Sequence, residues 1–119
     1  MQEATKITNR KATAVSGAAV SILAFSGDIS SASKESILAA YHSVNGATPK
    51  ILLDFTGIDY INSSGIAIII QMLLEASKSS AGTIAIFGLS PHFQKVFTMV
   101  GIHKYAKLYT GEKEALAEA

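Results

Sequence analysis

Along this chain, segments in which apolar residues have the spacing of a β-strand alternate with segments in which they have the spacing of a helix. The pattern therefore predicts strands and helices in turn. Within residues 20–25, apolar side chains fall on both faces of the expected strand, which indicates that both faces are partly covered. The unbroken apolar run Ile51–Leu53 is typical of a central strand. Small residues at 12–19 predict a loose turn, and Gly27-Asp28 predicts the end of a strand. The expected strands are residues 5–26, as one bent strand or a pair, and residues 50–56, 83–87 and 105–109.

Four other segments have helical spacing. Apolar side chains at positions 37, 38, 41 and 44 form one stripe of a first helix, and Gly46 followed by Pro49 predicts its end. Serine is a preferred N-cap and proline is favoured in a first turn, so Ser90-Pro91 predicts a helix start. The expected helices are residues 30–45, residues 63–80, the segment between Ser90 and Gly101, and residues 112–119.

In two of the expected helices, the positions of the apolar residues indicate which surface faces the core. In residues 63–80, Ala67 and Ile68 widen the apolar arc, so this helix is either nearly engulfed by the core or uses part of its surface for docking. In the helix after Ser90, one stripe is predicted to face the core: Phe93, Val96, Phe97 and Val100.

The alternation of strands and helices indicates the fold class. We expect a single α/β domain over residues 1–119, with a mixed, mostly parallel β-sheet of about four to five strands flanked by about four helices. Parallel neighbours would be joined by right-handed crossovers. A chain of this length buries enough surface for one core without staples.

Composition excludes several classes of function. The formal net charge of +1 argues against a nucleic-acid binder, which needs a clustered basic face. The absence of cysteine excludes disulfides, thiol nucleophiles and thiolate metal sites, and three scattered histidines argue against zinc. The N-terminus lacks the layout of a signal peptide, and the longest apolar stretch is too short to cross a bilayer. We expect a soluble, cytoplasmic protein without membrane insertion.

The serine pair, Ser63 and Ser64, is the main candidate site. A buried strand that ends near Asp54 is followed, after a small turn, by Asn62-Ser63-Ser64-Gly65. The first turn of a helix has unpaired backbone N–H groups and a partial positive charge, so it favours an anion. A phosphate on one of these hydroxyls would fit there and would change the surface that a partner meets. On local chemistry alone, an ordinary helix cap is the simpler interpretation.

A serine hydrolase is a competing interpretation of the same residues. Asp28, Asp54 and Asp59 could converge near the serine pair, as acids at strand ends do in α/β folds. A serine nucleophile needs a base, however, and His92 is more simply explained as an exposed first-turn residue. Neither a glycine-rich phosphate loop nor a G-x-S-x-G elbow is present. We therefore expect a binding module and not an enzyme.

Several short segments in a fixed order resemble one known family. They are Gly27-Asp28-Ile29, Leu53-Asp54-Phe55, Ile61-Asn62-Ser63-Ser64-Gly65-Ile66, Gly88-Leu89-Ser90-Pro91 and Val100-Gly101-Ile102. Their order and spacing, over nearly the whole chain, resemble the STAS domain and more closely the bacterial anti-sigma factor antagonists. Two positions differ from the usual pattern: Asn62 replaces the acid that commonly precedes the first serine, and Ser30 stands where an acid is often found.

The resemblance implies a function for Ser63. In that family the usual motif is Asp-Ser-Ser/Thr-Gly, and a partner serine kinase, which is also the anti-sigma factor, phosphorylates the first serine. The unphosphorylated protein would bind this kinase and free a sigma factor, phosphorylation of Ser63 would block binding, and a phosphatase would restore it. ATP and magnesium would be supplied by the kinase, so the chain itself would need no cofactor.

The expected contact surface surrounds Ser63. The residues that we expect to contact the partner are Asp28, Ile58, Tyr60, Asn62, Ser64 and Gly65. Ile66 is consistent with either a contact or a core role. The alternative function is a non-phosphorylated STAS adaptor subunit of a transporter or signalling complex, in which Ser63 would be only a cap or contact residue.

Overall fold

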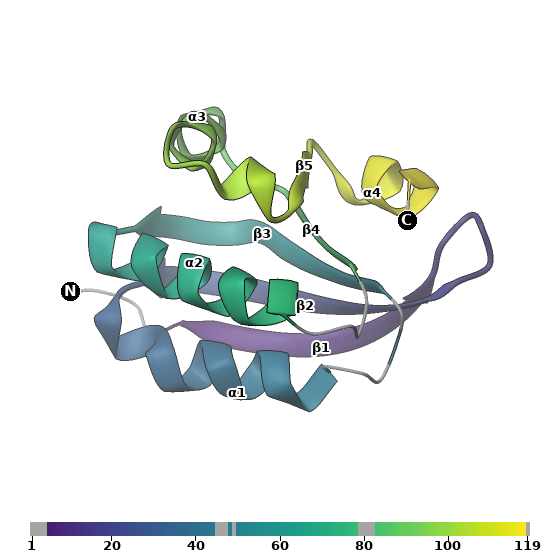
Figure 1. The fold of residues 1–119 in the computed structure, drawn as a ribbon, viewed down its shortest axis with the longest axis horizontal. Coiled ribbons are helices and arrows are strands. Elements are labelled where there is room, and N and C mark those ends of the chain that lie inside the picture. Colours follow the sequence, from purple (N-terminus) through teal and green to yellow (C-terminus); the bar gives the residue numbers. More distant parts are fainter. Residues whose placement is uncertain (1–4, 45–47, 49, 79–82, 119) are drawn as a thin grey trace.

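One mixed β-sheet organises the protein (Figure 1). The computed structural model describes residues 5–44, 48, 50–78 and 83–118, and within them five strands lie in the order β1-β2-β3-β4-β5. The strands are β1 (Lys6–Thr13), β2 (Ala19–Ile29), β3 (Lys50–Ile61), β4 (Thr83–Phe87) and β5 (Lys107–Tyr109). The first pair is antiparallel and the other three pairs are parallel. The expected α/β class, with its mixed and mostly parallel sheet, is confirmed.

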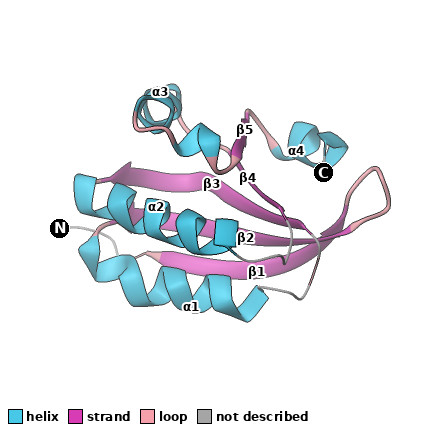
Figure 2. Cartoon of the chain, viewed as in Figure 1, coloured by secondary structure: helices cyan, strands magenta, loops and turns pink. Residues whose placement is uncertain are grey.

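The helices cover the sheet unequally (Figure 2). They are α1 (Lys34–Val44), α2 (Ser63–Lys78), α3 (Pro91–Met99) and α4 (Glu112–Glu118), with short 3-10 turns η1 (Ser31–Ser33) and η2 (Ile102–Lys104). Side chains of α1, α2 and α3 join the larger core on one face, whereas Ala115 of α4 packs into a smaller core on the other face. The sheet therefore has apolar cores on both faces, as the alternation in residues 20–25 predicted.

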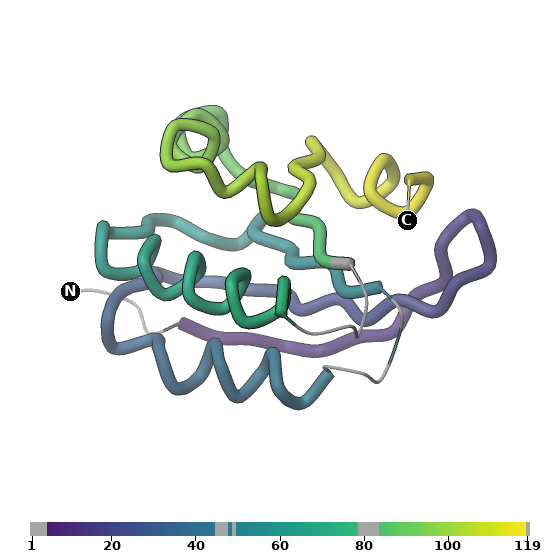
Figure 3. The backbone as a smooth tube through the Cα atoms, in the orientation of Figure 1, coloured from purple at the N-terminus to yellow at the C-terminus, as the bar shows by residue number. Residues whose placement is uncertain are grey.

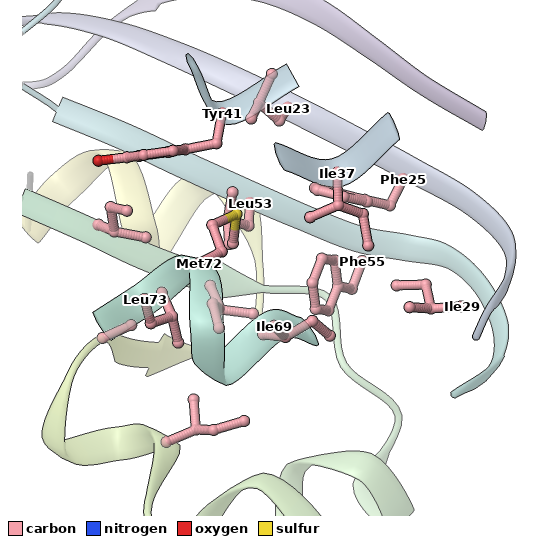
Figure 4. Close-up of a cluster of buried hydrophobic side chains, with 14 of the residues drawn as sticks. Leu23, Phe25, Ile29, Ile37, Tyr41, Leu53, Phe55, Ile69, Met72 and Leu73 are labelled. Carbon is pink, nitrogen blue, oxygen red and sulfur yellow. The ribbon is translucent and has the colours of Figure 1, made fainter. Parts of the chain in front are cut away.

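Aromatic and aliphatic side chains interlock in the larger core (Figure 4). The rings of Phe25 and Phe55 meet edge to face with centroids 4.8 Å apart, and Phe55 meets Phe97 of α3 at 6.1 Å in the same way. Edge-to-face geometry is favoured by the quadrupole of aromatic rings and stabilises the pair beyond its buried area. These contacts fix α3 relative to the strands that lead to the serine pair.

Two strands are longer than the sequence predicted. The expected end of β2 at Gly27-Asp28 was wrong, because β2 continues to Ile29, and the expected end of β3 at Thr56 was wrong, because β3 continues to Ile61. Register shifts between Ala24 and Ser26 and between Gly27 and Asp28 absorb the irregular residues, so the parallel pairing continues to the ends of both strands. Local turn signals cannot reveal this, because the neighbouring strand supplies the hydrogen bonds.

Several helix predictions also need adjustment. The first helix begins as the 3-10 turn η1, capped by Ser30, and becomes an α-helix only at Lys34. The last strand starts at Lys107 and not at Tyr105, because η2 occupies the chain up to Lys104. The predicted stop at Gly46-Pro49 and the ends of the second and fourth helices, 79–80 and 119, lie outside the described residues.

The structure explains the apolar surfaces of α2 and α3. Ile68, Ile69, Met72 and Leu73 of α2 are buried, while Ala67 is exposed and Leu74 is 38% exposed. The helix is therefore packed on a wide face without being engulfed. In α3 the predicted core stripe is confirmed for Phe93 and Phe97, but Val100, at the C-cap, is 48% exposed.

One end of the molecule collects the features that define the site. The trace in Figure 3 shows the chain leaving the carboxyl ends of the parallel strands and entering α1, α2 and α3 at the same end of the sheet. The serine pair lies there, at the junction of β3 and α2. In α/β sheets this is the end where ligands and partners commonly bind.

Candidate functional site

Asn62 forms the junction between β3 and α2. Its backbone N–H donates to the carbonyl of Ile29 at 3.1 Å, which continues the pairing with β2. Its side-chain Oδ1 accepts from the backbone N–H of Gly65 at 2.8 Å, and its carbonyl accepts the first helical bond from Ile66 at 3.0 Å. Asn62 is therefore the N-cap of α2. The amide oxygen of asparagine supplies the acceptor that this cap requires.

Gly65 allows the first turn of α2 to lie against the end of β2. A Cβ atom at this position would lie 2.5 Å from the carbonyl oxygen of Ile29 and 2.9 Å from its Cγ2 atom. Only glycine lets the two backbones approach so closely. Gly65 is buried, so in this structure it positions the serine pair through packing; its contact with a partner stays a prediction.

The serine pair is exposed to solvent on the first turn of α2. Within the described residues, neither hydroxyl has a side-chain hydrogen bond or ion pair. Because the cap of the helix is provided by Asn62, the expectation that Ser63 serves only as a cap has no support in this geometry. Both hydroxyls are accessible for modification.

An exposed aromatic residue, Tyr60, lies three residues before Ser63. Tyr60 is 52% exposed, and its ring meets that of Phe93 of α3 with centroids 6.0 Å apart. Tyr60 pairs in register with Asp28 of β2, which is partly buried, while Ile58 is partly buried against the larger core. Tyr60 is therefore the most exposed apolar group that the sequence placed near Ser63. Ile66 is partly buried against the same core, which favours a packing role.

The structure separates Asp54 from the serine pair. Asp54 lies inside β3, seven residues before its end, and not at a strand end as predicted. Its Oδ1 accepts from the Thr56 N–H at 2.9 Å, and its Oδ2 lies 3.8 Å from Arg10 Nη2 of β1. Asp54 therefore stabilises its own strand and the contact of that strand with Arg10 of β1.

Within the described residues, the two serines are not paired with a base. His92 is exposed, and its ring contacts Phe93 with centroids 4.9 Å apart. In the described part of the chain, no histidine or carboxylate hydrogen-bonds either serine, and no group of acids and histidines could hold a metal ion. What the site offers is an exposed hydroxyl pair on the first turn of α2, shortly after the exposed Tyr60.

Two residues that support this end of the molecule were missed by sequence reasoning. The apolar stripe assigns Phe93 only to the core, yet Phe93 also holds the ring of Tyr60. Gly88 follows β4 with φ of +85°, and a Cβ there would lie 2.3 Å from the Thr56 hydroxyl oxygen. The Gly88-Leu89-Ser90-Pro91 pattern gave a signal for this tight connection, but not for the strand it packs against.

Comparison with known families identifies the family to which this fold belongs. The family model described as STAS domain matches residues 10–115, so the chain belongs to the STAS domain family. No curated protein sequence matches the chain.

Solved structures of anti-sigma factor antagonists share the fold. The antagonist from Mycobacterium paratuberculosis is 19% identical, with 93% of this chain and 92% of that chain covered and a TM-score of 0.72. The Bacillus cell fate determinant SpoIIAA in its phosphorylated form is 22% identical, with 93% and 96% covered and a TM-score of 0.66. The murine anion transporter Slc26a9 also matches, at 15% identity and a TM-score of 0.66, over 82% of this chain but only 17% of that chain. The chain is therefore a STAS domain with structural neighbours among the anti-sigma factor antagonists.

The length and hydrophobicity of the helices bear on membrane insertion. Within the described residues, no helix is long and apolar enough to cross a membrane.

Proposed function

We propose that this protein is an anti-sigma factor antagonist whose binding to an anti-sigma serine kinase is controlled by phosphorylation of Ser63. The observation that carries the proposal is the exposed Ser63 hydroxyl on the first turn of α2, a helix that Asn62 caps and that closely follows the exposed Tyr60. Similarity to an antagonist solved in both unphosphorylated and phosphorylated forms supports it.

The position of Ser63 is compatible with a phosphate in the folded protein. Negative charge is favoured at a helix N-terminus, so phosphorylation there should leave the fold intact. The same phosphate adds about −1.5 to −2 charge to the contact surface. Burying that charge against a partner requires its desolvation, and an acidic partner surface would repel it. The switch would therefore act on partner binding and not on folding.

Asn62 makes this turn less negative than an acid would. Asparagine provides the cap through its amide oxygen without adding a charge beside Ser63. A phosphoserine at position 63 would thus meet one repulsive neighbour fewer. The kinase, in turn, would have to recognise the turn without that acid.

The phosphorylation itself is tested by mass spectrometry with site mapping. The protein is incubated with each candidate anti-sigma kinase of its own genome and with ATP and magnesium. We expect one phosphate on Ser63, none on the Ser63→Ala variant, and unchanged phosphorylation of the matched Ser64→Ala variant. Phosphate on Ser64 alone, or on neither serine with any kinase, would refute the assignment of Ser63.

The effect on binding is tested with the same kinase. Ser63→Asp places a negative charge at the site, and we expect it to weaken the complex at least tenfold in calorimetry. Ser63→Ala should bind as tightly as wild type and remain bound in the presence of ATP. Equal affinity of Ser63→Asp and wild type would remove the switch from the proposal.

A non-phosphorylated adaptor is the second candidate. The similarity to a segment of the transporter Slc26a9 favours it, because a similar fold occurs there within a much longer chain. Stable binding to a transporter ATPase or signalling protein, together with no phosphate on Ser63, would select the adaptor function over the antagonist function.

A further inference from the structure

The two edges of the sheet differ in length. The order of the strands places β1 at one edge and β5 at the other. β5 has three residues, whereas β1 has eight and runs along the lower border of the sheet in Figure 1. Every second residue of an edge strand directs its backbone N–H and C=O groups away from the sheet. The edge at β1 is therefore the longer surface on which another strand could be added.

The outer side of β1 is unpaired. Across the residues that the structure describes, the backbone of β1 pairs with β2 and with no other segment or side chain. Six of its eight side chains are exposed, while Ile7 and Ala12 are half-buried. An open row of backbone donors and acceptors of this kind is a template for a further strand.

β1 lacks two of the features that commonly block an edge. Its pairing with β2 runs from Lys6 to Thr13 without a register shift, and its sequence, KITNRKAT, contains no proline. Bulges and prolines both prevent strands from adding to an edge. β1 instead has charge, since it contains three cations and no acid. Charge repels some strands and attracts others, so it selects a partner and does not close the edge.

Two of the three cations are available to a partner. Arg10 donates a hydrogen bond to Glu112 and lies 3.8 Å from Asp54, so its charge is compensated within the chain. The Lys11 ammonium donates to the neutral Ser21 hydroxyl at 2.9 Å, which leaves its charge uncompensated. Lys6 is exposed and, within the described residues, has neither a hydrogen bond nor an ion pair. The formal charge that β1 presents is therefore +2, from Lys6 and Lys11.

The positions of these two lysines define the chemistry of the partner. Successive side chains of a strand alternate between its faces, so Lys6 lies on the face of Arg10 and Lys11 on the face of Ile7. The two lysines are separated by about 17 Å along the strand, at about 3.4 Å per residue. Ile7 packs against the larger core, so an apolar side chain suits the position opposite it. The complementary strand has an acid opposite each lysine and an apolar residue between them.

A second copy of this chain is a poor occupant of the edge. Pairing of β1 with β1 would bring three cations from each copy, and no acid, into one joint. Like charges placed across a joint oppose association. An acidic strand would instead meet opposite charge along the same edge.

We propose that β1 binds an extended acidic segment of a partner protein, which joins the sheet as a further strand. The main chain of the segment would pair with the outward N–H and C=O groups of β1, and its carboxylates would meet Lys6 and Lys11. No residue of β1 belongs to the proposed phosphorylation site. This contact is therefore separate from the switch at Ser63.

The test uses the full chain labelled with ¹⁵N and two synthetic peptides at millimolar concentration. Both peptides have the length of β1 and alternate valine with threonine. One has glutamates at the two positions that face Lys6 and Lys11 in antiparallel register, and the other has lysines there. We expect the glutamate peptide to shift the amide resonances of β1 and to slow hydrogen exchange at every second amide, because only the outward N–H groups are free. The lysine peptide should do neither.

A charge swap separates binding from folding. Lys6→Glu should weaken binding of the glutamate peptide about fivefold and should allow the lysine peptide to bind, since the cross-strand pair changes sign. Lys95→Glu, at an exposed lysine of α3, makes the same change in net charge and should bind both peptides as wild type does. Binding gained by the lysine peptide cannot result from loss of structure.

Four outcomes would overturn the proposal. They are unchanged exchange in β1 with the glutamate peptide, equal binding of the two peptides by wild type, an unchanged peptide preference in Lys6→Glu, and protection of the outward β1 amides that rises with protein concentration without peptide. The last outcome would assign the edge to a second copy of the chain. Ser63→Ala should bind the glutamate peptide as wild type does, so failure of the phosphorylation switch leaves this test unaffected.

Discussion

Replacing Gly65 by alanine tests whether the close approach of α2 to β2 positions the serine pair. The new Cβ would lie 2.5 Å from the oxygen, 2.8 Å from the carbon and 2.9 Å from the Cγ2 of Ile29. Two of these atoms belong to the backbone of β2, which is held between β1 and β3. The strand cannot move aside alone, so the first turn of α2 must shift.

Two opposing terms set the magnitude. Alanine is about 1 kcal/mol more favourable than glycine in a helix interior, and this gain is smaller in a first turn, where the N–H groups are not yet in the helical ladder. Overpacking a tight contact costs about 1–3 kcal/mol. We expect the contact to prevail and the free energy of unfolding to fall by about 1–2 kcal/mol. For a domain of this length, Tm should fall by roughly 4–8 °C.

Urea unfolding and thermal melts measure the effect. Ser64→Ala, one residue earlier in the same turn, removes an exposed hydroxyl that forms no side-chain hydrogen bond within the described residues. This control should change the free energy of unfolding by less than about 0.5 kcal/mol. A Gly65→Ala protein at least as stable as wild type would show that helix propensity outweighs the contact with Ile29. In that case Gly65 would have no positioning role.

Three further changes test the site and its supports. Asn62→Ala removes the cap of α2 and should lower the free energy of unfolding by about 1 kcal/mol in urea titrations. Asn62→Asp keeps a capping oxygen and should be at least as stable as wild type. An alanine variant as stable as wild type would contradict the capping role. Tyr60→Ala should weaken kinase binding about tenfold in calorimetry, since exposed tyrosines often dominate interfaces, and an unchanged Kd would exclude Tyr60 from the contact. The hydrogen bond from Arg10 holds the pKa of Glu112 below its ordinary value of 4.5. The ionised carboxylate therefore stabilises the folded protein at pH values above this ordinary pKa. This stabilisation is lost as the pH falls through the lowered pKa of the folded state. At neutral pH, the free energy of unfolding of wild type should exceed that of Glu112→Gln by less than about 1 kcal/mol, as for other exposed ion pairs. In acid, the two proteins should have equal free energies of unfolding. A constant difference at all pH values would refute the ion pair.

Local patterns in the sequence determined much of the fold. The change between strand and helix periods predicted the element order, because each period reports which side chains of a segment are buried together. Ser90-Pro91 marked the start of α3, and the apolar run at Ile51–Leu53 marked a strand covered on both faces. The position of the serine pair at the start of α2 was also predictable, because helix starts have local chemical signals.

Only the tertiary structure decided which distant segments meet. The extension of β3 to Ile61 depends on pairing with β2, and the partner of Asp54 is Arg10, 44 residues earlier in the chain. Gly65 is required because of the Ile29 backbone, and residues between positions 50 and 118 together line one concave surface. A periodic pattern records that a residue is buried but not what buries it. Register, close approach and concavity therefore arise only when segments far apart in sequence pack together.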